Sequence, residues 1–436
     1  MATVLPRAMN FLLVPLHTQT LETVAYSDNT TFYVYAAFFN VLLTFGMETA
    51  FFRFFSQASN KKTVFSTLLI ALSVSAILFL IGVAWNTTAL SNGFAIPILH
   101  LQFLIGVLVL DTLVVAPFAY LRAIEKSQKF ASIKLLNILV YAGLNFLFLW
   151  LVPSFGWEVL EVFPNQKVNY IFLANIAASV VTFVVLLPYW FSVPLHFDWQ
   201  LFKKMFRYGF PIMIAGVAFV INENLDKLLL KKLLNEDIMG AYSGCYKLAV
   251  FMTLFIQAFR LGAEPFFFNH ASDKKAPQTY AIILKYFVIV GAAVMLLIVI
   301  YIELLKTLLI RNESYWIALE IVPIILLANL FLGVYHNLSI WYKLTDRTRF
   351  GMYISLFGAV ITIVFNLWLI PQIGFIASAW ATLLAYGSMM ILSYFLGKKY
   401  YPVPYPVLRM ATYLTAATCL GAIHFYAFYA NYAVGT

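Results

Sequence analysis

Ten charged residues lie within or beside long apolar segments of this sequence, and their chemistry has to be explained first. A charge at membrane depth costs about 2.5–3.5 kcal/mol on insertion scales, so it persists where it faces water or a partner. A mixture of cations and carboxylates predicts a cavity whose positive groups hold an anion, whereas a ring of one sign would indicate an ion channel. The five basic and five acidic residues are Arg7, Arg53, Lys227, Lys247, Arg260, Glu48, Asp111, Glu223, Asp226 and Glu264.

The segment at residues 219–230 reads FVINENLDKLLL and carries three of these charges. Asp226 and Lys227 close a predicted span, so an interfacial position is an alternative to a functional one. Glu223 lies one turn deeper, and its i, i+4 spacing to Lys227 would allow a local ion pair on one helix face.

The other charges differ in how easily an interfacial position explains them. Arg53, Arg260 and Glu264 lie near predicted span ends, where long side chains can extend their charged heads to the interface. Arg7 and Lys247 have apolar neighbours on both sides. Asp111 lies between LIGVLVL and TLVVAPF, so we expect it to be buried or to face a cavity.

The composition shows which solvent surrounds these charges. Only 11% of the 436 residues are charged, and the mean hydropathy is +0.88. Soluble domains carry roughly 25% charged residues, so lipid must cover much of this chain. The net charge of +10 does not indicate nucleic-acid binding, because Lys and Arg occur in short clusters between apolar runs. Cys245 and Cys419 form no CxxC motif, and the scattered histidines suggest no metal site.

A membrane-spanning helix needs about 20 mostly apolar residues, and the sequence offers thirteen such segments. We therefore expect an all-α polytopic membrane protein with short loops and no room for a soluble catalytic domain. The predicted spans are 1–16, 32–52, 64–85, 95–121, 131–152, 168–191, 208–225, 238–259, 281–305, 315–341, 350–370, 373–396 and 408–428.

Basic residues alternate between the junctions of these spans. Of the 28 Lys and Arg, twenty lie at alternate junctions, six lie at the others, and Arg7 and Lys247 lie within spans. Because cytoplasmic loops carry the excess of Lys and Arg, the first set and the N-terminus are predicted to be cytoplasmic.

A weak internal repeat relates the two halves of the chain. GMETAFFRFFSQAS at 46–59 and GAEPFFFNHAS at 262–272 each combine Gly-x-Glu with a phenylalanine cluster. If they are equivalent, spans 1–6 and 7–12 are parallel copies, which is a known transporter plan. Chance similarity between two Phe-rich segments remains the alternative.

Two segments resemble a known family. VLPRAMNFLLVPLHTQTL at 4–21 is similar to the first helix of polysaccharide exporters and lipid-linked oligosaccharide flippases of the MOP superfamily, which usually carries an Arg and ends in PLYT. Residues 201–268 resemble the start of the family's second half. They contain a basic stretch, YGxP, an Asp-Lys pair, a sequence like GxYS, and QAFR followed by PFFF.

The resemblance implies a fold, a cargo and partners. The fold is MATE-like, with 12 or 14 helices in two six-helix lobes around a central cavity. The cargo is an oligosaccharide on a polyprenyl diphosphate, flipped to the outer leaflet of the bacterial inner membrane by alternating access for O-antigen, capsule or exopolysaccharide. A polysaccharide polymerase and glycosyltransferases are the expected partners. The expected domains are an N-lobe (1–191), a cytoplasmic basic linker (192–207), a C-lobe (208–396) and an additional helix (397–436).

Within this plan, the charged residues receive roles as hypotheses. Arg7, Arg53, Arg260 and Lys247 are candidates for holding the diphosphate, since guanidinium forks match phosphate oxygens in two-point contacts. The candidates for coupling to H⁺ or Na⁺, or for gating, are Glu48, Asp111, Glu223, Asp226, Lys227 and Glu264. No catalytic residue, metal or other cofactor is expected.

The chain departs from the family pattern at both ends, because the first helix lacks its usual N-terminal half and a fourteenth helix is missing. A MATE-type exporter of drugs or cations is the closest alternative, but the basic excess argues against it. A membrane glycosyltransferase or polymerase would require a large outer loop or an Asp-x-Asp metal-diphosphate site, and the chain contains no Asp-x-Asp.

Overall fold

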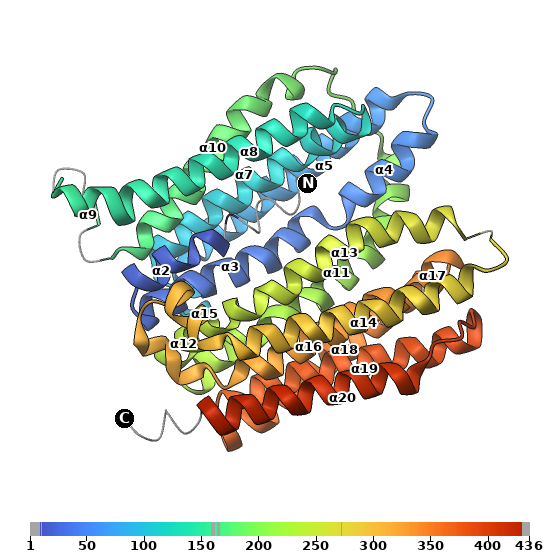
Figure 1. Cartoon of the computed structure of the whole chain (residues 1–436). Helices are drawn as coiled ribbons and strands as arrows, with labels where there is room; N and C mark the ends of the chain where they lie inside the picture. Colours follow the sequence, from blue (N-terminus) through green and yellow to red (C-terminus); the bar gives the residue numbers. More distant parts are fainter. Residues whose placement is uncertain (1–8, 10, 158–161, 164–165, 272, 430–436) are drawn as a thin grey trace. The chain divides into compact units, whose positions relative to one another are not determined.

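The computed structural model describes residues 9, 11–157, 162–163, 166–271 and 273–429, and every regular element in this part of the chain is helical. The candidate site residue Arg7 lies outside the described residues. The elements, labelled in Figure 1, are α2 (Val14–Thr20), α3 (Thr23–Thr44), α4 (Met47–Gln57), α5 (Lys61–Trp85), α6 (Thr87–Phe94), α7 (Ile98–Ala123), α8 (Ser127–Phe146), η1 (Leu147–Leu151), α9 (Val152–Phe155), α10 (Val168–Trp190), α11 (Trp199–Leu233), α12 (Glu236–Tyr246), η3 (Lys247–Ala249), α13 (Val250–Asn269), α14 (Ala276–Ile300), α15 (Ile302–Leu309), η4 (Glu313–Ala318), α16 (Ile321–Leu338), α17 (Ile340–Leu344), α18 (Arg349–Ile373), α19 (Ile376–Tyr400), α20 (Val407–His424) and η5 (Phe425–Tyr429).

Within the described residues, eleven helical segments are long and apolar enough to cross a membrane. They coincide with the eleven predicted spans from 32–52 to 373–396, which confirms this part of the prediction. The predicted span 1–16 begins outside the described residues, and α20 occupies most of the segment predicted at 408–428. The number of helices thus agrees with the expected all-α polytopic membrane fold.

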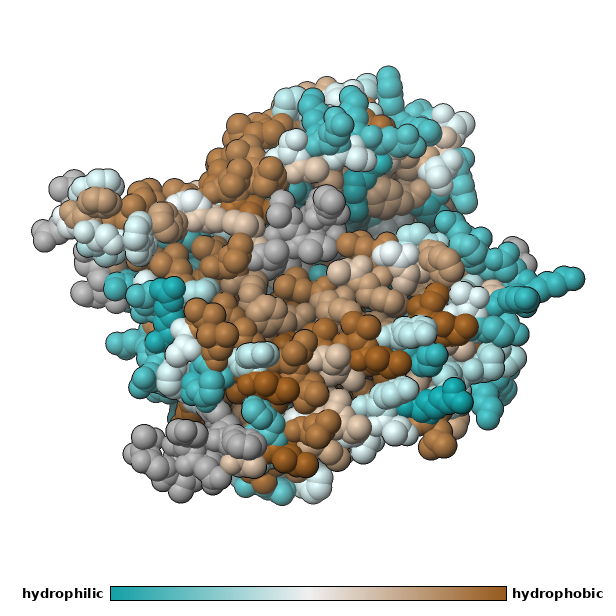
Figure 2. All heavy atoms as spheres, viewed as in Figure 1, coloured by the Kyte–Doolittle hydropathy of each residue, from teal (hydrophilic) through white to brown (hydrophobic). Residues whose placement is uncertain are grey.

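The surface of these helices is suited to lipid. Ile282, Val290 and Leu297 on α14 are each about half exposed. Figure 2 shows mostly apolar side chains over the middle of the helices on this face and hydrophilic side chains toward their ends. Because burial of apolar surface away from water is favourable, such a band is stable within a bilayer and unstable in water.

The chain forms two compact units, which are described separately. Unit 1 comprises Met1–Leu21 and Asp28–Val220, and unit 2 comprises Glu22–Ser27 and Ile221–Thr436. In unit 1, α10 packs against α7 and α8, and α5 packs against α7. In unit 2, α19 packs against α16 and α18, while α14 packs against α20 and α16. The span at Ile321–Leu344, which contains α16, is the most enclosed of the candidate spans, since 78% of its most apolar 18-residue stretch is buried.

α11 is a continuous helix of 35 residues, from Trp199 to Leu233. It therefore includes the second half of the predicted basic linker at 192–207 and the charged segment at 219–230. This continuity places Glu223 and Lys227 on one helix face, as their spacing predicts. The division of the chain into lobes at 191 and 208 stays a prediction.

A tight backbone contact in unit 1 explains the glycine that opens the GMETAFF motif. Between α3 and α4 the helix is broken at Phe45 and Gly46, whose φ angles are 33° and 72°. A Cβ atom on Gly46 would lie 2.2 Å from the carbonyl oxygen of Gly209 on α11. Only glycine satisfies both the left-handed conformation and this close approach.

The variant Gly46→Ala should therefore be less stable than the wild type by about 2 kcal/mol or more, since the left-handed conformation alone costs 1–2 kcal/mol. The measurement is the midpoint of heat-induced loss of the monodisperse peak in detergent. Gly82→Ala is the control, because Gly82 is a helical position where a Cβ meets open space. A Gly46→Ala midpoint equal to that of Gly82→Ala would contradict the contact.

Candidate functional site

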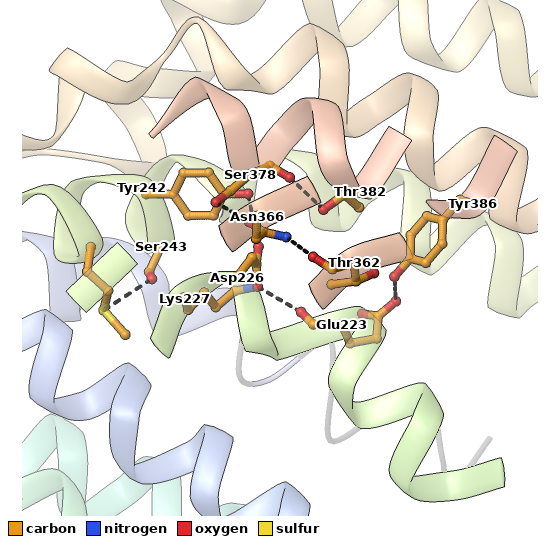
Figure 3. Close-up of polar contacts among 11 residues, drawn as sticks. Glu223, Asp226, Lys227, Tyr242, Ser243, Thr362, Asn366, Ser378, Thr382 and Tyr386 are labelled. Atoms are coloured by element: carbon orange, nitrogen blue, oxygen red, sulfur yellow. Dashed lines mark hydrogen bonds and ion pairs between the residues drawn. The ribbon is translucent and has the colours of Figure 1, made fainter. Parts of the chain in front are cut away.

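A buried polar network in unit 2 surrounds the charged segment of α11 (Figure 3). The side chains of Asp226 and Lys227 are only 2% and 8% exposed. The Lys227 ammonium donates to Asp226 Oδ1 at 3.0 Å and to the Glu223 carbonyl oxygen at 2.8 Å. The Tyr242 hydroxyl donates to Asp226 Oδ2 at 2.9 Å, and the Tyr246 ring centroid lies 4.2 Å from Lys227 Nζ. The ion pair is thus enclosed by hydrogen bonds and an aromatic face, not exposed at an interface.

Neutral side chains of α11, α18 and α19 extend this network between the three helices. Asn222 donates to the carbonyl oxygen of Ser355 at 3.1 Å and accepts from the Thr362 hydroxyl at 3.0 Å. One turn further along α18, Asn366 accepts from the Ser378 hydroxyl of α19 at 2.7 Å. These contacts tie α11, α18 and α19 together through groups that would be costly to bury unpaired.

The second carboxylate of the segment contacts α19. Glu223 Oε1 accepts a hydrogen bond from the Tyr386 hydroxyl. Glu223 and Asp226 thus bring two carboxylates into a network that also contains the Lys227 ammonium. The Lys227 ammonium also contacts the main-chain oxygen of Glu223, as well as the carboxylate of its neighbour Asp226.

A second charged cluster joins α13 and α17 in unit 2. Arg260 contacts Glu264 Oε1 through Nη2 at 2.9 Å and Nε at 3.2 Å. Lys343 Nζ contacts the same oxygen at 2.9 Å. The three side chains are 36%, 35% and 25% exposed, so they remain accessible to a ligand. Two cations directed at one oxygen form a geometry suited to an anion.

Glu48 and Arg53 of unit 1 lie in the segment 46–59, which the predicted internal repeat pairs with residues 262–272 of unit 2. Glu48 forms an ion pair with Arg122 of α7, not with a residue of its own helix. Arg53 is exposed, and its guanidinium lies 4.4 Å from the centroid of the Tyr208 ring. Arg53 and Arg260 are therefore both accessible, but Arg260 is already held by a carboxylate.

Asp111 lies within a polar group of unit 1 that includes α3, α7, α8 and α10. It accepts a hydrogen bond from the Ser179 hydroxyl at 2.8 Å and lies close enough to Lys134 to be attracted by its charge. On the same side of α10, Asn175 donates to the Tyr33 hydroxyl at 3.1 Å, and that hydroxyl lies 3.0 Å from the Tyr141 hydroxyl. Asp111 thus has partners inside unit 1, as its position in the span predicts.

Lys247 follows α12 in the short helix η3 and is partly buried. Within the described part of the chain, no carboxylate lies at ion-pair distance from it. The neighbouring charge of Lys227 acts on it repulsively. Lys247 is therefore a cation without a protein counter-anion among the described residues, whereas Lys227 is neutralised by Asp226.

The sequence prediction missed the uncharged members of the unit 2 network. Thr362 and Asn366 on α18, and Ser378 and Thr382 on α19, follow i, i+4 spacing within apolar spans. Such spacing places polar groups on one helix face, which is a usable signal for helix contacts inside a membrane. As for metals, no group of three or more His, Cys, Asp or Glu side chains suited to an ion occurs among the residues described.

Two family models match this chain. The model described as polysaccharide biosynthesis protein matches residues 1–269, and the model described as MatE matches residues 211–368. No curated protein matches the sequence.

Solved structures share the fold at low sequence identity. The lipid II flippase MurJ in an inward closed conformation aligns with a TM-score of 0.73 at 14% identity, over 98% of this chain and 92% of MurJ. An inward-facing multidrug resistance MATE transporter aligns with a TM-score of 0.69 at 12% identity, over 95% and 96% of the two chains. A MOP superfamily transporter from Pyrococcus furiosus, described as having a binding pocket of reverse polarity, aligns with a TM-score of 0.61 at 10% identity, over 94% of each chain.

These matches agree with the eleven apolar helices of the described residues. The resemblance read from the two sequence segments is confirmed, and the MATE-like fold class is confirmed with it. Within its described part, the chain has eleven helices long and apolar enough to cross a membrane and shares the fold of the MurJ and MATE structures, and it belongs to the polysaccharide biosynthesis protein family.

Proposed function

We propose that this protein flips a polyprenyl-diphosphate-linked oligosaccharide from the cytoplasmic to the outer leaflet of a bacterial inner membrane. The observation that carries the proposal is that Arg260 and Lys343 both contact one carboxylate oxygen of Glu264. Their side chains are 36% and 25% exposed, so a ligand can reach them. Two cations in this arrangement favour a doubly charged headgroup, and membership of the polysaccharide biosynthesis family supports such a cargo.

The roles follow from where each cation lies. Arg260 of unit 2 is assigned to the diphosphate together with Lys343. Arg53, Lys247 and Arg7 stay candidates for holding it, on the basis of their charge. A guanidinium offers two parallel N–H donors, so it holds phosphate oxygens in a fixed orientation. The N-terminus is cytoplasmic in this proposal, and the exported oligosaccharide is passed to a polymerase, with glycosyltransferases supplying the lipid-linked precursor. The protein itself carries out no covalent step.

Coupling to an ion gradient is assigned to the network in Figure 3. Proton exchange is assigned to Glu223, because its carboxylate accepts a hydrogen bond from Tyr386 of another helix and so can link protonation to the contact between α11 and α19. Protonation would weaken the acceptor for the Tyr386 hydroxyl and so loosen α11 from α19. Asp111, Glu48 and Glu264 are the remaining coupling or gating candidates, and Na⁺ in place of H⁺ is an outcome that the measurement below distinguishes.

A second candidate function is export of drugs or cations, which the MatE match and the MATE neighbours favour. An exporter of cations would need a site dominated by carboxylates. The excess of accessible cations at Arg53, Arg260 and Lys343 disfavours it.

The function is tested by complementation. The protein is expressed in a cell that lacks its own O-antigen flippase, and surface polysaccharide is compared with lipid-linked precursor trapped inside. We expect restored surface polymer and depleted precursor. Membrane insertion is checked in parallel, and resistance to cationic dyes is measured in the same cells. Dye resistance without transport of any tested lipid-linked oligosaccharide would replace the flippase with the exporter.

If Glu223 couples transport to a proton gradient, the variant Glu223→Gln should lose the response of flipping to that gradient. In proteoliposomes, acceleration of wild-type flipping by an imposed pH gradient should disappear in this variant, while flipping without a gradient persists, because glutamine keeps the Tyr386 contact but carries no titratable proton. A gradient of Na⁺ at constant pH provides the second arm. Glu313→Gln is the control, since Glu313 lies in η4 outside the candidate spans. A gradient response that survives in Glu223→Gln would remove Glu223 from the coupling step.

A further inference from the structure

The Glu264 carboxylate lies between the two cations Arg260 and Lys343, where a bound anion would also be held. Arg260 Nη2, Arg260 Nε and Lys343 Nζ all donate to Glu264 Oε1, at 2.9, 3.2 and 2.9 Å. A single oxygen that accepts from a guanidinium and an ammonium is the arrangement that an oxygen of a bound phosphate would make. In this structure the Glu264 carboxylate therefore fills the position between Arg260 and Lys343.

The charges around this cluster leave room for an additional anion. Arg260 and Lys343 carry two positive charges and Glu264 one negative charge. His336 and Tyr335 on α16 lie close enough to Arg260 to be affected by its charge and add no carboxylate. The neighbouring Tyr342 hydroxyl lies 3.4 Å from the Tyr335 hydroxyl and also adds no carboxylate. A diphosphate brings more negative charge than one carboxylate, so it can compete for both cations.

We propose that Glu264 is an internal counter-anion that the diphosphate displaces from Arg260 and Lys343, and that returns to them when the substrate leaves. This inference rests on the proposed function and adds Lys343 and Glu264 to its binding site. Exchange of one anion for another leaves neither partly buried cation without a counter-charge at any stage. It also limits the net affinity, because the diphosphate gains only the difference between its contacts and those of the carboxylate.

The consequence concerns release. A headgroup held by two unopposed cations would dissociate slowly, and transport requires binding that is weak enough to reverse. A carboxylate one helical turn from Arg260 can re-form its ion pair within the same helix, because i and i+4 side chains share a face. Glu264 thus lowers affinity and accelerates release.

The test uses the full chain in lipid nanodiscs, with two probes: inorganic pyrophosphate and undecaprenyl diphosphate. Glu264→Gln should bind each probe about tenfold more tightly than the wild type, which corresponds to removal of roughly 1.4 kcal/mol of competition. Its dissociation rate should fall, and its flipping rate in proteoliposomes should fall with it. Lys343→Gln should weaken binding of both probes. Glu303→Gln is the matched control, since it breaks another ion pair of unit 2, with Lys306, outside the candidate spans.

The outcomes separate the displacement of Glu264 from the proposed lipid-linked cargo. Unchanged or weaker binding in Glu264→Gln overturns the displacement, because the carboxylate would then only hold the cations in place. Tighter pyrophosphate binding without any binding of the lipid supports the displacement and overturns the proposed lipid-linked cargo. Equal binding of the lipid by the wild type and Glu264→Gln keeps the cargo and overturns the displacement.

Discussion

Replacement of Lys227 by methionine is expected to destabilise unit 2 by about 3–5 kcal/mol. This is the cost of leaving one partner of a buried ion pair without the other. In the variant, the Asp226 carboxylate would keep the Tyr242 hydroxyl at 2.9 Å and would face an apolar thioether in place of the ammonium. The measurement is the thermal midpoint in detergent, together with the yield of inserted protein.

The matched control for this prediction is the double variant Asp226→Asn with Lys227→Met. It removes both charges while an amide keeps the hydrogen-bonding capacity toward Tyr242. Because a neutral pair has no charge to bury, the double variant should recover most of the lost stability, and the two changes should be strongly non-additive. A double variant as unstable as the sum of its parts would mean that the ion pair is not the source of the effect.

Arg260→Ala is expected to lower flipping by at least about tenfold, the equivalent of roughly 1.4 kcal/mol of lost transition-state binding. The reason is twofold: the diphosphate loses a two-donor contact, and Glu264 is left with Lys343 alone. Surface polymer in the complementation assay and the initial flipping rate in proteoliposomes are the two measurements. Arg53→Ala, whose guanidinium lies over Tyr208 without a carboxylate partner in the described residues, should lose transport with less effect on stability.

The matched control for the arginine series is Arg409→Ala, because Arg409 is exposed on α20 in the same unit. It should transport at the wild-type rate. Wild-type transport in both Arg53→Ala and Arg260→Ala would remove these two residues from the binding site. The family membership would stand, since it depends on the sequence match and the fold.

Much of the fold was predictable, because the signal for a membrane span is local. Residues 281–305 are apolar enough to identify a helix without any partner, and α14 (Ala276–Ile300) occupies most of that segment. The same holds for the i, i+4 relation between Glu223 and Lys227, which needs only the helical repeat of α11. The boundary of α11 was harder to predict, since its first turns pass through basic residues that composition assigns to a linker.

The sequence alone determined that lipid covers much of the chain, where the membrane spans lie, and which charged residues need partners. Which partner each charge has was decided by tertiary structure. Glu48 pairs with Arg122, which lies 74 positions away, and Glu264 shares Lys343, which lies 79 positions away. Glu223 meets Tyr386 across 163 positions. Helical periodicity gives the face on which a side chain lies, but packing alone decides which other helix meets that face. A buried charge therefore predicts that a partner exists, and the fold selects the partner.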